Sequence, residues 1–133
     1  MDVPACLKPK DIEKVAAEVV LLAKEQPDRI ANCVYTEDGE TGECIVGCAL
    51  ERVGVDMLHL NNIGLGASEL VSQLAGYTGR LDDELSEKDR QHLEFIRKAQ
   101  IRQDDDDSWS EAVHEAVRYM SEECEYEIPC RND

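Results

Sequence analysis

Aromatic residues are scarce in this sequence: its 133 residues include four tyrosines, one tryptophan and one phenylalanine. Six aromatic rings are too few to fill the core of a domain of this size. The core is therefore expected to be aliphatic, built from Leu, Val, Ile and Ala. Hydrophobic residues make up 42% of the chain, which suits a single domain over residues 1–133. The ends, 1–9 and 121–133, are expected to be flexible.

Basic residues are also few, because 14 Lys and Arg stand against 30 Asp and Glu, a net charge of −16. Such a chain repels phosphate, which excludes direct nucleic-acid binding through a basic face and disfavours anionic membranes. The negative charge has three possible roles: it keeps the protein in solution, it attracts a basic protein partner, or it makes the surface imitate nucleic acid.

Long apolar runs are missing as well. No stretch approaches the ~20 residues of a membrane span, and the first twenty residues carry seven charges and no apolar h-region of a signal peptide. A cytoplasmic location is therefore expected. In a reducing cytosol the six cysteines are expected to be free thiols rather than a disulfide framework, and no cofactor is expected.

Helical periodicity, with apolar residues at i, i+3, i+4 and i+7, predicts a mainly α fold. Ser86 is expected to cap one helix, and Ser108 and Glu111 form a capping box at the start of another. The five predicted helices cover residues 11–25, 44–53, 67–75, 86–103 and 109–120.

The segment 44–53 is apolar on nearly all sides, which is typical of a central helix around which the others pack. Gly54 follows it as a C-terminal cap, and Gly47 inside it indicates a close helix contact. A strand over 44–46 is the competing interpretation. The side chains predicted to be buried in this helix and in 109–120 are Val46, Ala49, Leu50, Val113 and Val117.

Between the first two helices, β-branched and aromatic residues over 30–35 suggest a short strand, and Asp-Gly and Thr-Gly pairs at 37–42 suggest a turn. The prediction is a small β-hairpin or an irregular loop near 31–43. Residues 56–60 are expected to form a short helical turn.

Three cysteines are candidate metal ligands. Cys44 and Cys48 would share one side of a helix, with Cys33 across the proposed turn, and three thiolates with a histidine can hold zinc. Helical cysteines flanked by Ile, Val and Leu are, alternatively, buried small hydrophobic residues. The histidines His59, His92 and His114 are expected at the surface or its boundary.

The run Asp104–Asp107 is expected to end the helix before it, because negative charges at a helix C-terminus oppose the helix dipole. More than half of the net charge lies from Asp104 onward. This asymmetry predicts one acidic face, with Glu111 and Glu115, that binds a basic partner. The predicted partner-binding residues are Asp104, Asp105, Asp106, Asp107, Glu111 and Glu115.

The stretch Cys44–Gly54, reading C-I-V-G-C-A-L-E-R-V-G, resembles a motif of small uncharacterised proteins from actinobacteriophages and actinobacteria. Gln100, the acidic turn at 104–107 and Trp109–Ala112 match a second part of the pattern. This chain departs from it in the turn before Trp109, where those proteins tend to carry a Gly among the acids. The resemblance implies a phage accessory protein in a bacterial host cytoplasm, and it supplies no catalytic residues.

Three hypotheses follow from these patterns. The first is a non-enzymatic interaction protein, phage-encoded, that binds and modulates a host protein. The second is an acidic nucleic-acid mimic that blocks a basic host protein. The third is a small zinc module or enzyme.

Overall fold

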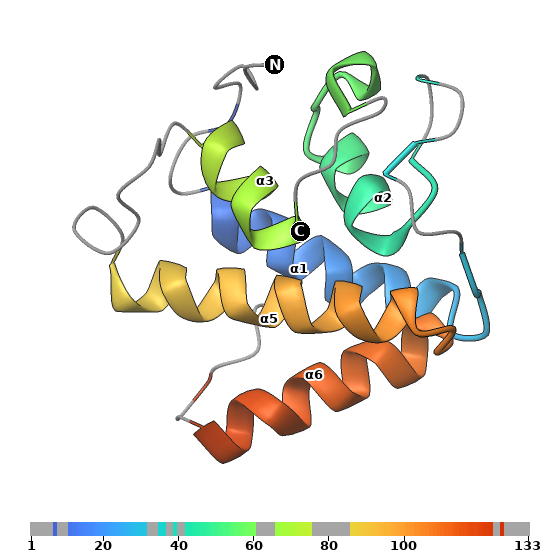
Figure 1. Ribbon diagram of the computed structural model, residues 1–133, viewed down its shortest axis with the longest axis vertical. Coiled ribbons are helices and arrows are strands. Elements are labelled where there is room, and N and C mark those ends of the chain that lie inside the picture. The colour runs from blue at the N-terminus through green and yellow to red at the C-terminus, as the bar shows by residue number, and fades with distance from the viewer. Residues whose placement is uncertain are drawn as a thin grey trace.

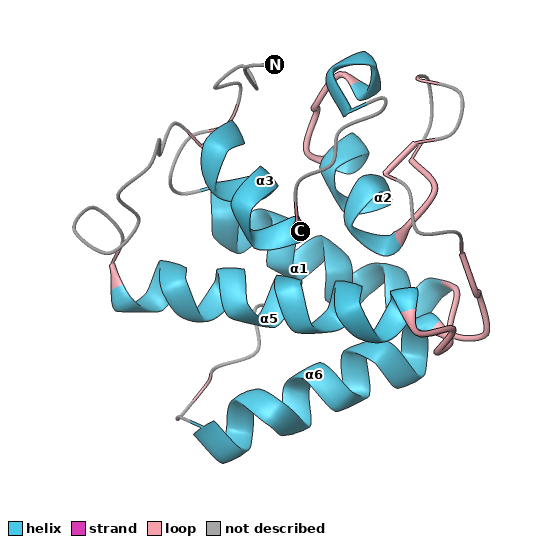
Figure 2. Cartoon of the chain, in the orientation of Figure 1, coloured by secondary structure: helices cyan, strands magenta, loops and turns pink. Residues whose placement is uncertain are grey.

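The computed structural model describes residues 11–31, 42–60, 66–75 and 86–123, together with Leu7, Tyr35, Thr36, Gly39 and Tyr126. Over these residues the chain is mainly helical and contains no strand (Figure 2), which confirms the mainly α class predicted from the sequence. The elements are α1 (Asp11–Glu25), α2 (Ile45–Arg52), a 3-10 turn η1 (Met57–Leu60), α3 (Ala67–Leu74), α5 (Glu87–Asp104) and α6 (Trp109–Glu123).

Helix α5 is the element that brings most of the others together. It runs across the molecule with α6 along one side and α2 and α3 on the other (Figure 1), and it also packs on α1. Helix α2 is well buried, but it packs mainly on α1, α5 and η1. The prediction that the helices are arranged around the 44–53 segment is therefore not confirmed.

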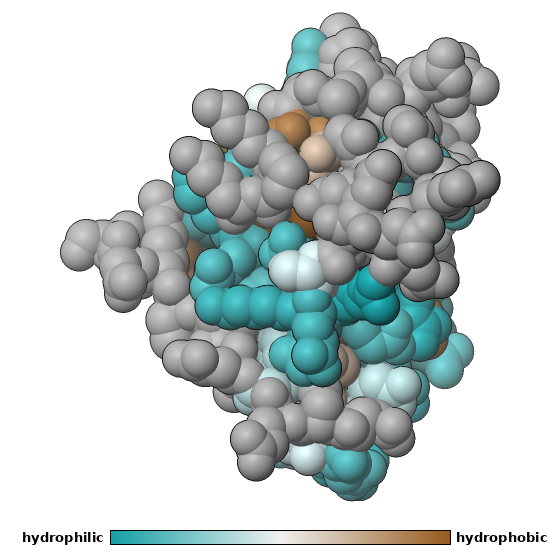
Figure 3. All heavy atoms as spheres, turned by 90° about the vertical axis from the view of Figure 1, so that its left-hand side faces the viewer, coloured by the Kyte–Doolittle hydropathy of each residue, from teal (hydrophilic) through white to brown (hydrophobic). Residues whose placement is uncertain are grey.

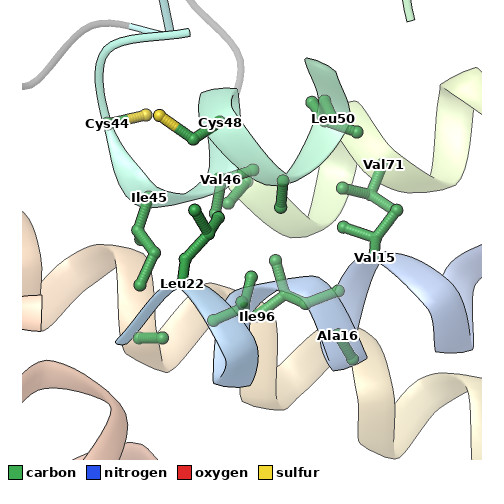
Figure 4. Close-up of a cluster of buried hydrophobic side chains, with 14 of the residues drawn as sticks. Val15, Ala16, Leu22, Cys44, Ile45, Val46, Cys48, Leu50, Val71 and Ile96 are labelled. Atoms are coloured by element: carbon green, nitrogen blue, oxygen red, sulfur yellow. The ribbon is translucent and has the colours of Figure 1, made fainter. Parts of the chain in front are cut away.

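The hydrophobic core lies between these helices and is mainly aliphatic, as expected. Four of the five side chains predicted to be buried are buried, whereas Val117 is only partly buried at the edge of α6. Two of the few aromatic residues, Phe95 and Trp109, are also fully buried. Figure 4 shows part of the core, where α1, α2, α3 and α5 contribute Val15, Leu22, Ile45, Val46, Leu50, Val71 and Ile96.

Capping interactions define where two helices start. The Ser86 hydroxyl accepts a hydrogen bond from the Asp89 amide at 3.1 Å, and the Ser108 hydroxyl accepts one from the Glu111 amide at 3.3 Å. Both bonds satisfy N–H groups that a first helical turn leaves free, so the predicted starts of α5 and α6 are confirmed.

The two ends of the chain are described only in part. Leu7 is buried, and its amide donates to the Leu74 carbonyl at 2.8 Å, next to the end of α3. Helix α6 continues through Ser121–Glu123, beyond the predicted end at residue 120. The other residues of 1–9, and those after Glu123 except Tyr126, lie outside the described residues.

The connection from α1 to α2 is an irregular loop where it is described. Thr36 and Gly42 form an isolated antiparallel bridge, and the Glu43 amide donates to the Tyr35 carbonyl at 2.9 Å. Neither Ile30 nor Ala31 lies in a strand, and the rest of the predicted strand is mostly outside the described residues.

The competing strand over 44–46 is wrong. Ile45 and Val46 are helical, because Cys44 acts as the N-cap and its sulfur accepts the Gly47 amide at 3.3 Å. A side-chain acceptor at this position favours a helix start over a continued extended chain.

Helices α2 and α5 end in the same way, with a residue of positive φ followed by a reversal of the chain. At α2 the residue is Gly54 (φ 98°), the predicted cap, and Val55 donates to the Leu50 carbonyl at 3.0 Å. At α5 it is Asp106 (φ 68°), and Asp107 donates to the Arg102 carbonyl at 3.2 Å. These are Schellman motifs, in which glycine is the usual residue at the left-handed position.

We expect Asp106→Gly to stabilise the protein by about 1 kcal/mol. Relief of the left-handed strain, roughly 1–2 kcal/mol, outweighs the added freedom of the unfolded chain, roughly 0.4–1 kcal/mol. Urea unfolding measures the difference. Asp105→Gly is the matched control, because Asp105 has a φ of −90° and gains nothing from glycine. Equal destabilisation by both changes would contradict this account of the turn.

Candidate interaction surface

Helices α5 and α6 border a groove lined by polar and charged residues. Its volume is about 390 Å³ and its walls are Arg102, Asp107, Ser110, Glu111, His114 and Glu115. A second groove of about 170 Å³ continues along the same two helices and shares Arg102 and Glu115 with the first. The other side chains that line the second groove are Lys98, Arg118, Tyr119 and Glu122.

The first groove brings together three of the six residues predicted to bind a partner, namely Asp107, Glu111 and Glu115. Asp105 and Asp106 are exposed in the turn just before Asp107. Asp104 is directed elsewhere: its Oδ1 accepts hydrogen bonds from Gln100 at 2.7 Å and from Gln103 at 3.1 Å. The acidic run therefore does not form one uniform face.

Two arginines lie among these acids. Arg102 donates to Asp107 at 2.8 Å, and Arg118 pairs with Glu115 at 2.7 Å and with Glu122 at 3.8 Å. The hydrogen bonds from Arg118 lower the pKa of Glu115. From Arg102 to Glu123 the chain still carries eight acids against two bases, a net charge of −6. The surface is thus negative overall but contains internal ion pairs.

Contacts with the α1–α2 connection hold the start of α6 in place. The Trp109 amide donates to the Arg29 carbonyl at 2.9 Å, and the Ser110 amide donates to the Pro27 carbonyl at 3.0 Å. The Arg29 guanidinium lies over the indole of Trp109, 4.4 Å from its centre. The groove residues at the start of α6 therefore lie on a helix end whose position is fixed by these contacts.

The end of α5 is held by Gln103, which is fully buried. Its Oε1 accepts the Ile45 amide at 2.9 Å, and its Nε2 donates to the Ala31 carbonyl at 3.4 Å. Gln100 accepts the Val46 amide at 3.3 Å. Two glutamines of α5 thus satisfy the free N–H groups at the start of α2 and fix the acidic turn relative to the core.

Sequence reasoning placed His114 on the outward side of α6 but missed the groove residues Arg102 and Ser110. Ser110 lies four residues before His114, so helical spacing could have added it to the predicted face. Arg102 comes from the other helix, and nothing in the sequence places α5 and α6 side by side at this point.

The candidate metal ligands Cys44 and Cys48 are brought together, and their sulfur atoms point toward one another (Figure 4). Both are buried free thiols, and the Cys48 thiol donates to the Gly42 carbonyl at 3.3 Å. Burial raises the pKa of Cys48, and it raises the pKa of Cys44 to about 12. Metal binding needs thiolates, so this environment favours the neutral pair.

The third candidate ligand, Cys33, lies outside the described residues. Over the described part of the chain, no group of three or more His, Cys, Asp or Glu side chains is arranged to hold a metal ion.

One of the three histidines, His92, differs from its predicted surroundings. His114 is exposed and lines the first groove, as a surface residue would. His92, expected at the surface or its boundary, is buried with 1% of its surface exposed. That prediction was wrong because the imidazole is covered by residues that are distant in the sequence, such as Tyr126. Nothing is described of the His59 side chain.

Figure 3 shows another side of the molecule, where the described surface is mainly hydrophilic and hydrophobic atoms are visible only in small patches. None of the described helices combines the length and the apolar character that a membrane crossing needs.

Comparison with known proteins found no matching family model, and neither a curated protein nor a solved structure is significantly similar to this chain.

Proposed function

We propose that this chain is a non-enzymatic interaction protein that binds a basic protein partner through an acidic surface on α5 and α6. The acidic surface consists of Asp105, Asp106, Asp107, Glu111 and Glu115. The observation that carries the proposal is the lining of the groove, which is charged and lies within a stretch of net charge −6. Negative potential concentrated in this way speeds encounter with a positive surface.

The carboxylates of this surface are suited to charge recognition. Glu115 has a lowered pKa because Arg118 donates to it, so it stays ionised at neutral pH. A general acid would instead need a raised pKa. Asp105 and Glu111 are exposed, so each offers its charge to a partner without first leaving a buried environment.

The resemblance around Cys44–Gly54 supports a more specific form of this proposal. In that form the chain is a phage accessory protein that binds and modulates a host protein in the bacterial cytoplasm. Capture from a bacterial lysate with mass spectrometry supplies a candidate partner. Displacement of this chain from that partner by nucleic acid would identify the acidic nucleic-acid mimic as the correct form.

We expect the double variant Asp105→Asn, Glu111→Gln to bind the captured partner with an association rate roughly 2–10-fold lower at low salt. The reason is the loss of two exposed charges from the acidic surface. The difference should shrink as salt screens the remaining charges. Stopped-flow or surface-based kinetics at several salt concentrations measures both effects. Asp104 and Asp107 are left unchanged because they have partners within the protein.

The matched control is Glu69→Gln, Glu87→Gln, which removes two exposed charges from the first turns of α3 and α5. It should leave the association rate nearly unchanged. Equal slowing by both double variants would mean that only net charge matters, and no slowing by the first would place the interface elsewhere.

A further inference from the structure

A buried histidine and a tyrosine from beyond the last helix form a contact that the proposed function does not use. His92 on α5 lies with its Nδ1 3.0 Å from the Tyr126 hydroxyl. The two rings meet edge to face, 5.6 Å apart at 73°. The Tyr126 ring also stacks on Phe95, with centroids 5.5 Å apart. Tyr126 lies three residues after the end of α6, and these contacts attach its side chain to α5.

The second nitrogen of His92 has a different environment. Nε2 is buried and has no hydrogen-bond partner in the described part of the structure. A neutral imidazole carries one N–H group and one lone pair, so the tyrosine hydroxyl satisfies one nitrogen whichever tautomer is present. An imidazolium carries two N–H groups, and the second would be buried without an acceptor. The packed arrangement therefore suits only the neutral ring.

The charged groups near His92 come from two helices. Burial is the main cause that lowers the His92 pKa, and Lys88 of α5 acts in the same direction. Glu13 of α1 and Asp89 of α5 favour the charged ring and oppose this effect. Glu13 itself is paired with Lys88 at 3.7 Å, which limits what it can offer to the imidazole.

We propose that protonation of His92 releases Tyr126 from α5, so that the His92–Tyr126–Phe95 contact is a pH-sensitive latch on Tyr126. Tyr126 is only half-buried. The charged groups near the His92 imidazole belong instead to the packed helices α1 and α5. Moving Tyr126 therefore lets water reach the imidazolium without separating α1 from α5. Release also uncovers the ring of Phe95.

The sign of the effect follows from the lowered pKa. The latched state binds fewer protons than the released state, in which His92 returns toward the ordinary value of about 6.5. The latch is therefore closed above pH ~6.5 and opens as the pH falls below that value toward the lowered pKa of the packed ring. Carboxylates with ordinary pKa values near 4 titrate below this range.

Incorporation of 3-fluorotyrosine tests the proposal, with the Tyr126 resonance assigned by Tyr126→Phe. Between pH 7.5 and 5 the fluorine signal of Tyr126 should move toward its position in urea. The midpoint should lie below 6.5, and the other three tyrosine signals should stay in place. Ring-carbon NMR of His92 should titrate with the same midpoint. Glu13→Gln should shift both midpoints to lower pH.

His92→Phe keeps an aromatic ring against Tyr126 and should abolish the pH-dependent movement. If that variant does not fold, His92→Gln serves the same purpose, because a neutral amide also cannot be protonated in this range. A Tyr126 signal that stays in place while His92 titrates would overturn the latch. So would a transition that persists without the histidine, or a joint movement of all four tyrosine signals.

Discussion

Gly47→Ala is expected to be strongly destabilising. A Cβ atom at this position would lie 2.1 Å from the Tyr35 carbonyl oxygen and 2.9 Å from its carbon. Both are backbone atoms, so relief requires the loop that precedes α2 to move away from it. Alanine gains about 1 kcal/mol over glycine in a helix interior, but the steric cost should exceed this gain. We expect a net loss of about 1–3 kcal/mol.

Urea unfolding of the variant measures this loss, and Gly66→Ser is the control. Gly66 has open space where a side chain would be and serves as the N-cap of α3 without a side-chain hydrogen bond. Serine is a preferred residue at such a position, so the control should be neutral or stabilising. If Gly47→Ala were also neutral, the loop would not pack on α2 as closely as described.

Gln103→Leu is expected to cause the other large loss of stability. The change preserves most of the side-chain volume but leaves the Ile45 amide and the Ala31 carbonyl without their partner. An unsatisfied buried group costs about 1–3 kcal/mol, so two such groups should account for a loss of roughly 2–6 kcal/mol. The unfolding free energy, from urea or heat, is the quantity to compare.

Gln103→Glu keeps the side-chain volume and changes the hydrogen bonding, so it tests the contribution of the hydrogen bonds to stability separately from the volume. A carboxylate at this position accepts the Ile45 amide but cannot donate to Ala31, and it lies beside the acidic Asp104. Burial and that neighbour raise its folded-state pKa, so the variant should lose stability at neutral pH. Relative to the parent, stability should recover as the pH falls toward 5 and the side chain gains a proton. No recovery would contradict the assigned roles of the two Gln103 atoms.

Local periodicity in the sequence was enough to predict the helices. Helix α1 spans Asp11–Glu25 as expected, because its apolar spacing begins and ends with a sharp change to polar residues. The end of α6 was misjudged, since the apolar pattern stops at Met120 while the helix continues to Glu123. Polar residues continue a helix without any apolar signal, so periodicity alone underestimates such ends.

The acidic surface could be predicted only in outline. The charge excess around Asp104–Asp107 was visible, but the Schellman turn at Asp106 sends neighbouring side chains in different directions. Asp104 meets Gln100 and Gln103, whereas Asp107 meets Arg102. A sequence lists these charges in order and does not show the turn that separates them.

The burial of His92 and Gln103 could not be predicted from the sequence for a related reason. His92 is covered by Tyr126, which is 34 residues away, and Gln103 bonds to Ile45, which is 58 residues away. Either side chain would be an ordinary surface residue on an isolated helix. Their roles arise only when the distant partner is in place, and neither partner has a local signature.

The glutamine contacts with α2 also have a consequence for synthesis on the ribosome. Helix α2 has eight residues, fewer than an isolated helix needs to be stable in water, and its first amides bond to Gln100 and Gln103 of α5. Those glutamines are translated roughly 3–12 s after Ile45 at 5–20 residues per second. During that interval the nascent chain lacks the glutamine side chains that bond to the first amides of α2. The apolar residues of α2 therefore remain available to chaperones until α5 has emerged.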